Sequence, residues 1–203
     1  MYLQRRLQNN NNFFKKIKEL DFSLLLCILL LGFISLSTMF STDGGEALFH
    51  TKSHFYKLII FTILMLFVSF LNIKFWFSIG YLSYLITIVM LIYTINFGIT
   101  ASGSKRWIDL YFINIQPSEL MKIFIILCLA KFFHRKRLEN VNSFYSVIIS
   151  LIIIFLPMSL VIIQPDLGTS LLISISGIIV LWFAGLNHKY FFYSFLIFIT
   201  SLP

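Results

Sequence analysis

The feature that most constrains the fold is a series of long apolar runs separated by short polar connectors. Three of these runs cover residues 22–40, 75–97 and 144–163. A helix of about 20 apolar residues is long enough to cross the hydrocarbon core of a bilayer. Because that core offers no water to the backbone, a spanning segment has to pair its own N–H and C=O groups, as an α-helix does. The sequence therefore predicts an all-α, polytopic transmembrane helix bundle.

The apolar runs predict about six complete spans followed by a truncated seventh. The expected spans are residues 22–40, 55–71, 75–97, 118–133, 144–163 and 167–184. A seventh run begins at Tyr190 and reaches Pro203, which is shorter than the roughly 20 residues that a span needs. We therefore expect residues 1–20 to form a basic tail, residues 21–203 to form one transmembrane domain, and the chain to end within its seventh span.

Composition agrees with this class and argues against a soluble nucleic-acid-binding protein. Hydrophobic residues make up 59% of the chain and charged residues only 12%, whereas soluble domains average about 25% charged residues. The net charge of +8 would suggest a nucleic-acid partner in a soluble domain. Here much of it lies beside predicted spans, where Lys and Arg set membrane orientation. We therefore expect no nucleic-acid binding.

Basic residues also predict which side of the membrane each connector occupies. The sequence KFFHRKR at residues 131–137 and the N-terminal tail are the two strongly cationic segments, the tail through Arg5, Arg6, Lys15, Lys16 and Lys18. Cytoplasmic loops carry an excess of Lys and Arg, so we expect a cytoplasmic N-terminus. The connectors at residues 41–54, 98–117 and 164–166 then lie on the outer face.

No metal site or disulfide is expected. Cys27 and Cys128 both lie inside apolar runs, where a thiol usually behaves as a small hydrophobic residue. His50 and His54 are four residues apart, but we expect no helix there to align them as ligands.

A polar passage at residues 103–122, GSKRWIDLYFINIQPSELMK, is the first candidate site. Lys105 and Arg106 are predicted on the outer face, against the positive-inside tendency. Adjacent cations of this kind suit a phosphate or diphosphate, because Arg offers a planar fork of donors and Lys a compact charge. They could equally contact ordinary anionic lipid head groups or pair with Asp109, and spacing alone leaves these readings open.

The same passage contains the start of a helix and an acid–base pair. We expect Pro117 and Ser118 to begin the fourth span, with Ser118 as its N-cap. Glu119 and Lys122 lie three residues apart on one helix face, so we expect them to be partners inside the bundle. Such a pair could be a structural clamp, a proton relay or a site for a polar head group.

The second polar block, QPDLGT at residues 164–169, lies at the connector between the fifth and sixth expected spans. Asp166 could simply cap the sixth helix. Alternatively, because this connector and residues 103–119 are predicted on the same outer face, carboxylates and cations from both could converge on one site.

These two blocks resemble signatures of the SEDS family. The first is similar to the family pattern of Arg-Trp followed by Gln-Pro-Ser-Glu and Lys, and the second, QPDLGTSLLI at residues 164–173, is similar to the elongation branch of the family rather than its division branch. The resemblance implies a multi-pass protein of the bacterial inner membrane, a peptidoglycan glycosyltransferase that polymerises lipid II on the outer face. Implied partners are a class B penicillin-binding protein and membrane proteins of the elongation complex, and the implied cofactor of the whole protein is a divalent cation.

The resemblance, together with the two adjacent cations, gives the expected site residues. Those expected to bind substrate are Lys105, Arg106, Gln116, Glu119, Lys122, Gln164 and Asp166, and those expected to shape the motifs are Trp107, Pro117, Ser118, Pro165 and Gly168. In the family the acidic residue regarded as catalytic follows the seventh span, so we expect no catalytic residue and no metal ligand before Pro203. Two other functions remain open, a flippase or transporter for the lipid-linked precursor and a non-catalytic truncated remnant.

Overall fold

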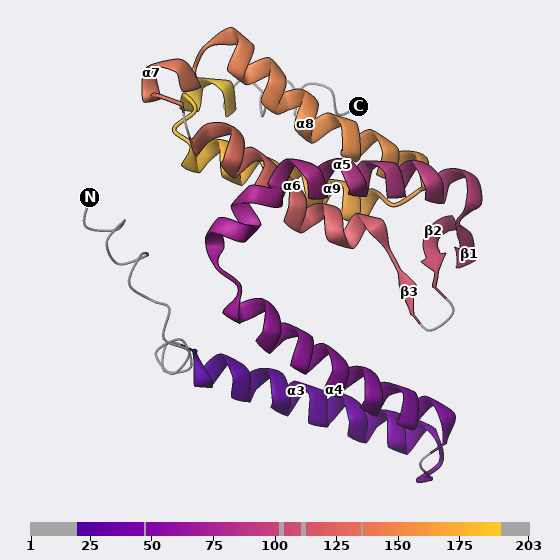
Figure 1. Ribbon diagram of the computed structural model, residues 1–203. Coiled ribbons are helices and arrows are strands. Elements are labelled where there is room, and N and C mark those ends of the chain that lie inside the picture. Colours follow the sequence, from indigo (N-terminus) through magenta and orange to yellow (C-terminus); the bar gives the residue numbers. More distant parts are fainter. Residues whose placement is uncertain (1–19, 47, 102–103, 111–112, 135, 192–203) are drawn as a thin grey trace. The chain divides into compact units, whose positions relative to one another are not determined.

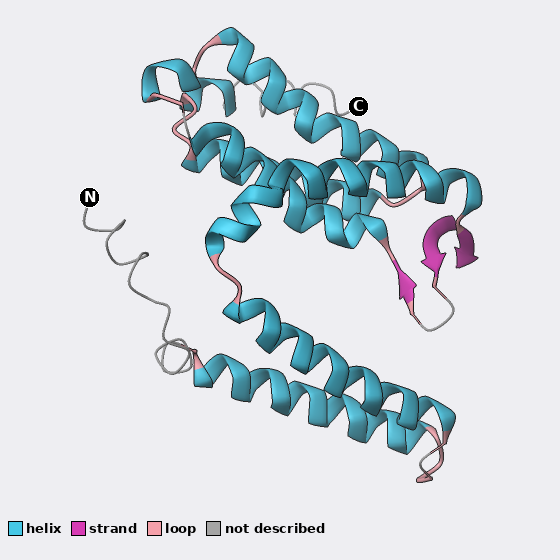
Figure 2. Cartoon of the chain, in the orientation of Figure 1, coloured by secondary structure: helices cyan, strands magenta, loops and turns pink. Residues whose placement is uncertain are grey.

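The computed structural model of the protein describes residues 20–46, 48–101, 104–110, 113–134 and 136–191, and these are mostly helical (Figures 1 and 2). They belong to two compact units, Met1–Asn72 and Ile73–Pro203. The expected basic tail, apart from its last residue, and the expected seventh span from residue 192 onwards lie outside the described residues.

The first unit is a pair of helices, α3 (Phe22–Thr42) and α4 (Phe49–Phe70). Asp21 caps α3, because its carboxylate accepts bonds from the N–H groups of Ser23 and Leu24 at 3.0 and 3.1 Å. The two helices approach closely at Gly32, where an added Cβ would lie 2.5 Å from Leu58 Cδ1. Small residues of this kind let membrane helices pack against each other.

Helix α4 begins earlier than the sequence predicted. It starts at Phe49 rather than at residue 55, so His50 and His54 lie on a helix, and the expectation of a non-helical segment there is wrong. His54 Nε2 is 2.9 Å from the hydroxyl oxygen of Ser35 on α3. This polar contact between the two helices explains why a segment with His and Lys residues can join the helix.

The second unit surrounds helix α6. Its elements are α5 (Ile73–Phe97), β1 (Ile99–Ala101), β2 (Ser104–Asp109), β3 (Asn114–Ile115), α6 (Pro117–His134), α7 (Leu138–Val141), α8 (Phe144–Ile163) and α9 (Leu167–Phe183). Helix α6 packs against α5 and α9, with α8 beside α9 (Figure 1). Met121, Ile125 and Leu129 lie on its buried face and are fully buried. The core of this unit is therefore built around α6.

Three short strands connect α5 to α6, so the all-α expectation fails at this connector. They form an antiparallel sheet in the order β1-β2-β3. Thr100, Trp107 and Ile108 are β-branched or aromatic residues of the kind that favours strands, and ladder pairing satisfies backbone groups that a coil would leave unpaired. Arg106 lies on β2 between Lys105 and Trp107, which both pair with β1, at the point where the register of the two strands shifts.

The structure supports a membrane protein, and four of its described helices coincide with predicted spans. Among the described residues, α3, α4, α5 and α8 are the helices that are both long enough and apolar enough to cross a membrane. Helix α9 is apolar but has 17 residues. Helix α6 has 18 residues and carries Glu119, Lys122 and Lys131. The predicted bounds of α8, residues 144–163, are the observed ones.

Candidate functional site

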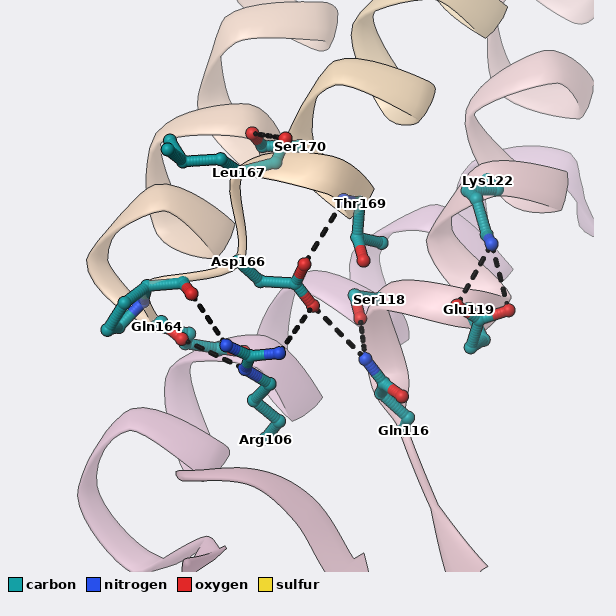
Figure 3. Close-up of polar contacts among 11 residues, drawn as sticks. Arg106, Gln116, Ser118, Glu119, Lys122, Gln164, Asp166, Leu167, Thr169 and Ser170 are labelled. Atoms are coloured by element: carbon teal, nitrogen blue, oxygen red, sulfur yellow. Dashed lines mark hydrogen bonds and ion pairs between the residues drawn. The ribbon is translucent and has the colours of Figure 1, made fainter. Parts of the chain in front are cut away.

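Arg106 joins the two polar blocks. It lies on β2, and its side chain reaches the turn between α8 and α9 (Figure 3). Its Nε donates to the carbonyl of Gln164 at 3.2 Å, and a terminal nitrogen donates to the carbonyl of Pro165 at 2.6 Å. The other terminal nitrogen is 3.5 Å from a carboxylate oxygen of Asp166. The guanidinium thus holds three consecutive residues of the second block.

Asp166 has a structural role and a place in the cluster at the same time. One carboxylate oxygen accepts the N–H of Thr169 at 3.1 Å and so caps α9. The other lies near Arg106 and accepts the side-chain N–H of Gln116 at 3.3 Å. The side chain is only 12% exposed. The carboxylate therefore caps α9 and also joins the cluster, because its two oxygens face different partners.

Gln116 brings the start of α6 into the same cluster. Its amide nitrogen donates to the hydroxyl oxygen of Ser118 at 3.0 Å as well as to Asp166. Helix α6 begins at Pro117, so Ser118 lies inside its first turn. The prediction that Ser118 is the N-cap is therefore wrong. Proline suits the first helical position because its fixed φ is already helical. The buried hydroxyl of Ser118 instead fixes the side chain of Gln116.

Gln164 ties the cluster to α5. Its side chain is buried, with 4% of the residue exposed, and its amide nitrogen donates to the carbonyl of Leu91 at 3.1 Å and to the hydroxyl of Thr94 at 2.9 Å. The residue was predicted to bind substrate, but its side-chain nitrogen is committed to α5. Leu91 and Thr94 were missed by the sequence analysis, although a hydroxyl in the last turns of an apolar run was a usable signal.

Glu119 and Lys122 form the expected ion pair, with the Lys122 nitrogen 2.8 Å from a carboxylate oxygen. Figure 3 shows the pair on α6, separate from the Arg106 cluster. The Glu119 side chain is 54% exposed and that of Lys122 26% exposed. Within the part of the chain that the structure describes, the pair therefore faces outward, and the expectation that it points into the bundle is not met. The packed face of α6 is taken by its apolar residues.

The remaining predicted residues lie around the cluster. Lys105 is exposed on β2, and Trp107 is half-buried and pairs with Ile99 across the ladder. Pro165 is exposed and lends its carbonyl to Arg106. An added Cβ at Gly168 would meet no atom within 4 Å. Packing among the described residues thus gives no reason for a glycine at this position.

The cluster has the chemistry of a binding site for an anionic or polar group. It combines a guanidinium, a carboxylate and an amide beside the first turns of α6 and α9, and helix N-termini favour negative charge. Asp166 supplies that charge in this structure. Among the described residues, no three His, Cys, Asp or Glu side chains are grouped so that they could hold a metal ion.

These observations define a mostly helical membrane protein in which two polar connectors meet in one cluster. Its sequence from residue 18 to residue 202 matches the profile of the FtsW/RodA/SpoVE family of cell cycle proteins. The chain belongs to this family, the SEDS family.

The curated relatives are matched by this chain over only part of their length. The chain is 40% identical to the peptidoglycan glycosyltransferase MrdB of Escherichia coli K12 over 110 residues, which are 52% of this chain and 28% of that protein. It is 31% identical to the probable peptidoglycan glycosyltransferase FtsW of Buchnera aphidicola subsp. Baizongia pistaciae over 182 residues, 87% of this chain and 47% of that protein. The matched region thus spans less than half of either relative.

Solved structures share the fold. The crystal structure of the rod shape determining protein RodA of Thermus thermophilus superimposes with a TM-score of 0.73 at 19% identity, covering 90% of this chain and 60% of that one. A chain from a structure described as the structural coordination of polymerization and crosslinking by a peptidoglycan synthase complex gives 0.76 at 20% identity, covering 90% and 52%. The fold is therefore RodA-like.

Proposed function

We propose that this chain forms the substrate-binding part of a RodA-type peptidoglycan glycosyltransferase, which polymerises lipid II during cell elongation and rod-shape maintenance. The observation that carries the proposal is the convergence of Arg106, Gln116 and Asp166 from two separate motifs. A family-specific pair of motifs that meets in space is better explained by a shared ligand than by helix initiation and capping alone. Relatives named as peptidoglycan glycosyltransferases support the same reaction.

The proposed topology puts this cluster on the outer face of the bacterial inner membrane. Residues 1–20 are the cytoplasmic tail, and residues 21–203 belong to one transmembrane domain with six spans and part of a seventh. Helices α6 and α9 are then spans in addition to the four that length and composition identify. The basic segment at residues 131–137, next to the end of α6, favours this orientation.

Within the site, the diphosphate of lipid II takes the position of the Asp166 carboxylate or lies beside it. Arg106 already holds an oxygen anion, and exposed Lys105 on the same strand adds a second cation. Phosphate groups are well suited to an Arg fork next to helix N-termini. Glu119 and Lys122 contact another polar part of the same substrate.

The proposed partners follow from the same assignment. They are a class B penicillin-binding protein and the membrane proteins of the elongation complex. The RodA-like fold shared with a chain of a peptidoglycan synthase complex supports an assembly of this kind. Co-purification of the tagged protein with its class B penicillin-binding protein from membranes tests the partner directly.

Direct binding to lipid II tests the proposed site. Lys105→Ala removes an exposed cation that has no side-chain contact to the cluster. A hydrogen bond between the Lys105 ammonium and the diphosphate would contribute about 1.5–3 kcal/mol, so its loss should weaken lipid II binding by about tenfold or more. Lys189→Ala, at another exposed lysine, is the matched control. The measurement is fluorescence titration of lipid II into nanodiscs that hold the protein. Equal affinity of wild type and Lys105→Ala would show that Lys105 has no role in binding the diphosphate.

The alternative function is a flippase for the lipid-linked precursor, and the exposed Glu119–Lys122 pair favours it, since an ionic pair on a helix within a membrane also suits a transport pathway. The full-length gene product, reconstituted with its class B penicillin-binding protein, separates the two. Glycan polymerisation that needs no translocation supports the transferase, whereas movement of labelled lipid II without polymer supports the flippase.

A further inference from the structure

Helix α8 contains a proline that leaves one backbone carbonyl of the helix without its usual hydrogen-bond donor. Pro157 lies inside α8 and is buried. It has no N–H, so it cannot make the helical bond to the carbonyl four residues earlier, which belongs to Ile153. In a membrane interior no water can replace that bond. The carbonyl of Ile153 therefore needs a donor from elsewhere.

Tyr84 on α5 supplies that donor. Its hydroxyl donates to the Ile153 carbonyl at 2.9 Å. The residue is 7% exposed, so the bond lies in the interior between the helices. Tyr84 thus fills the one hydrogen-bonding position on α8 that Pro157 leaves open.

A second bond ties the far end of the same segment to the same helix. The Gln164 side chain donates to Thr94, and the sequence separation of this pair is 70 residues, against 69 for Tyr84 and Ile153. Nearly equal separations mean that α5 and α8 run parallel and in register over this stretch. The stretch from Ile153 to Gln164, which contains Pro157, is therefore fastened to α5 at both ends.

We propose that Tyr84 is a positioning residue for the Arg106 cluster. Proline allows a helix to bend, and the segment beyond Pro157 carries Gln164, Pro165 and Asp166, which Arg106 holds. By donating the hydrogen bond that Pro157 cannot make, Tyr84 fixes the direction of this segment and with it the geometry of the cluster. This role concerns the shape of the site and holds whichever ligand the site binds.

A double-mutant cycle between the two side chains tests the proposal. Tyr84→Phe removes only the hydroxyl, and Pro157→Ala restores an N–H that can bond to Ile153. In the wild-type background Tyr84→Phe should raise the equilibrium constant for unfolding by about threefold to tenfold, the range of one hydrogen bond. In the Pro157→Ala background the same change should have less than a twofold effect. Unfolding of the full chain in detergent, followed by tryptophan fluorescence, gives these values.

Tyr93→Phe is the matched control, because Tyr93 lies on the same helix and is 49% exposed. It should give the same small effect in both backgrounds. If Tyr84→Phe lowers the free energy of unfolding as much with alanine at position 157 as with proline, the proposal is wrong. If Tyr84→Phe does not fold, recovery of folding in the double variant supports the proposal, and failure of the double variant to fold overturns it.

Spin-label distances test the positioning role itself. With both native cysteines replaced by alanine, one label pair is placed at the exposed positions Ile92 and Ile162, beyond the proline, and another at Leu85 and Leu151, before it. Tyr84→Phe should broaden the first distance distribution and leave the second unchanged, and Pro157→Ala should sharpen the first again. An unchanged first distribution, or equal broadening of both, would rule out a specific effect on the segment that carries the site.

Discussion

At the scale of single residues, Asp166 shows how one side chain can serve both packing and a site. Its carboxylate accepts an N–H at the start of α9 and also faces Arg106 and Gln116. The capping bond needs only an acceptor, whereas the contact with the guanidinium gains from negative charge. These two contributions can therefore be separated by substitutions that change one and keep the other.

Asp166→Asn should be tolerated better than Asp166→Ala. Asparagine is as good an N-cap as aspartate, so the first variant keeps the bond to Thr169 and loses only the charge, while alanine loses both, at a further cost of about 1 kcal/mol. Thermal or detergent unfolding of the three proteins measures the difference. Equal destabilisation by both substitutions would mean that the cap contributes nothing.

Asp43, outside the spans, gives a pH-dependent contact. Hydrogen bonds from the Thr51 hydroxyl and the Thr51 backbone N–H hold the pKa of Asp43 below its usual value. Because the folded pKa is below the unfolded one, the stabilisation is present above pH 3.8 and is lost as pH falls through the folded pKa. The protection factor of the Thr51 amide against hydrogen exchange should fall over that range. Thr51→Val, which removes the larger of the two effects, should move this transition to higher pH.

At the scale of elements, close approach of helices decides which glycines matter. A Cβ at Gly80 on α5 would lie 3.2 Å from the backbone oxygen of Leu127 on α6, which cannot rotate away. A Cβ at Gly177 on α9 would lie 2.6 Å from Ile154 Cγ1, a side-chain atom that can move only within a packed core. The packing of α6 and α8 thus depends on the absence of a side chain at these points.

Gly80→Val should therefore destabilise the second unit by about 1–3 kcal/mol through overpacking. Gly168→Ala is the matched comparison, since its Cβ would meet open space, and it should leave stability unchanged. Unfolding midpoints in detergent measure both. If Gly168→Ala instead lowers lipid II binding without lowering stability, the glycine is needed by the ligand and not by the fold.

At the scale of the whole molecule, the membrane orientation is open to a direct test. The proposed topology puts Lys105 outside and Lys189 inside, and both side chains are exposed. A cysteine at position 105 should react with a membrane-impermeant maleimide in intact spheroplasts, and a cysteine at position 189 only after permeabilisation. Labelling of both from the same side would show that the number of spans between them is not the one proposed.

The sequence by itself was sufficient to predict the class of protein, its family and most helix positions. Long apolar runs leave helices as the natural solution in a membrane, and α8 was predicted at its observed bounds. The short strands between α5 and α6 were not predicted, because their pairing depends on contacts across a turn rather than on a local period. The early start of α4 was missed for the same reason, since His54 finds its partner on α3.

For the candidate site, the sequence determined which residue types are present and the structure decided what each one does. The two motifs could be read directly, and their convergence could be expected from a shared face. Only tertiary structure decided that the Gln164 side chain is tied to α5, that Ser118 holds Gln116, and that Tyr84 completes α8 at its proline. The physical reason is that each of these bonds depends on a partner made available by packing, which local sequence does not specify.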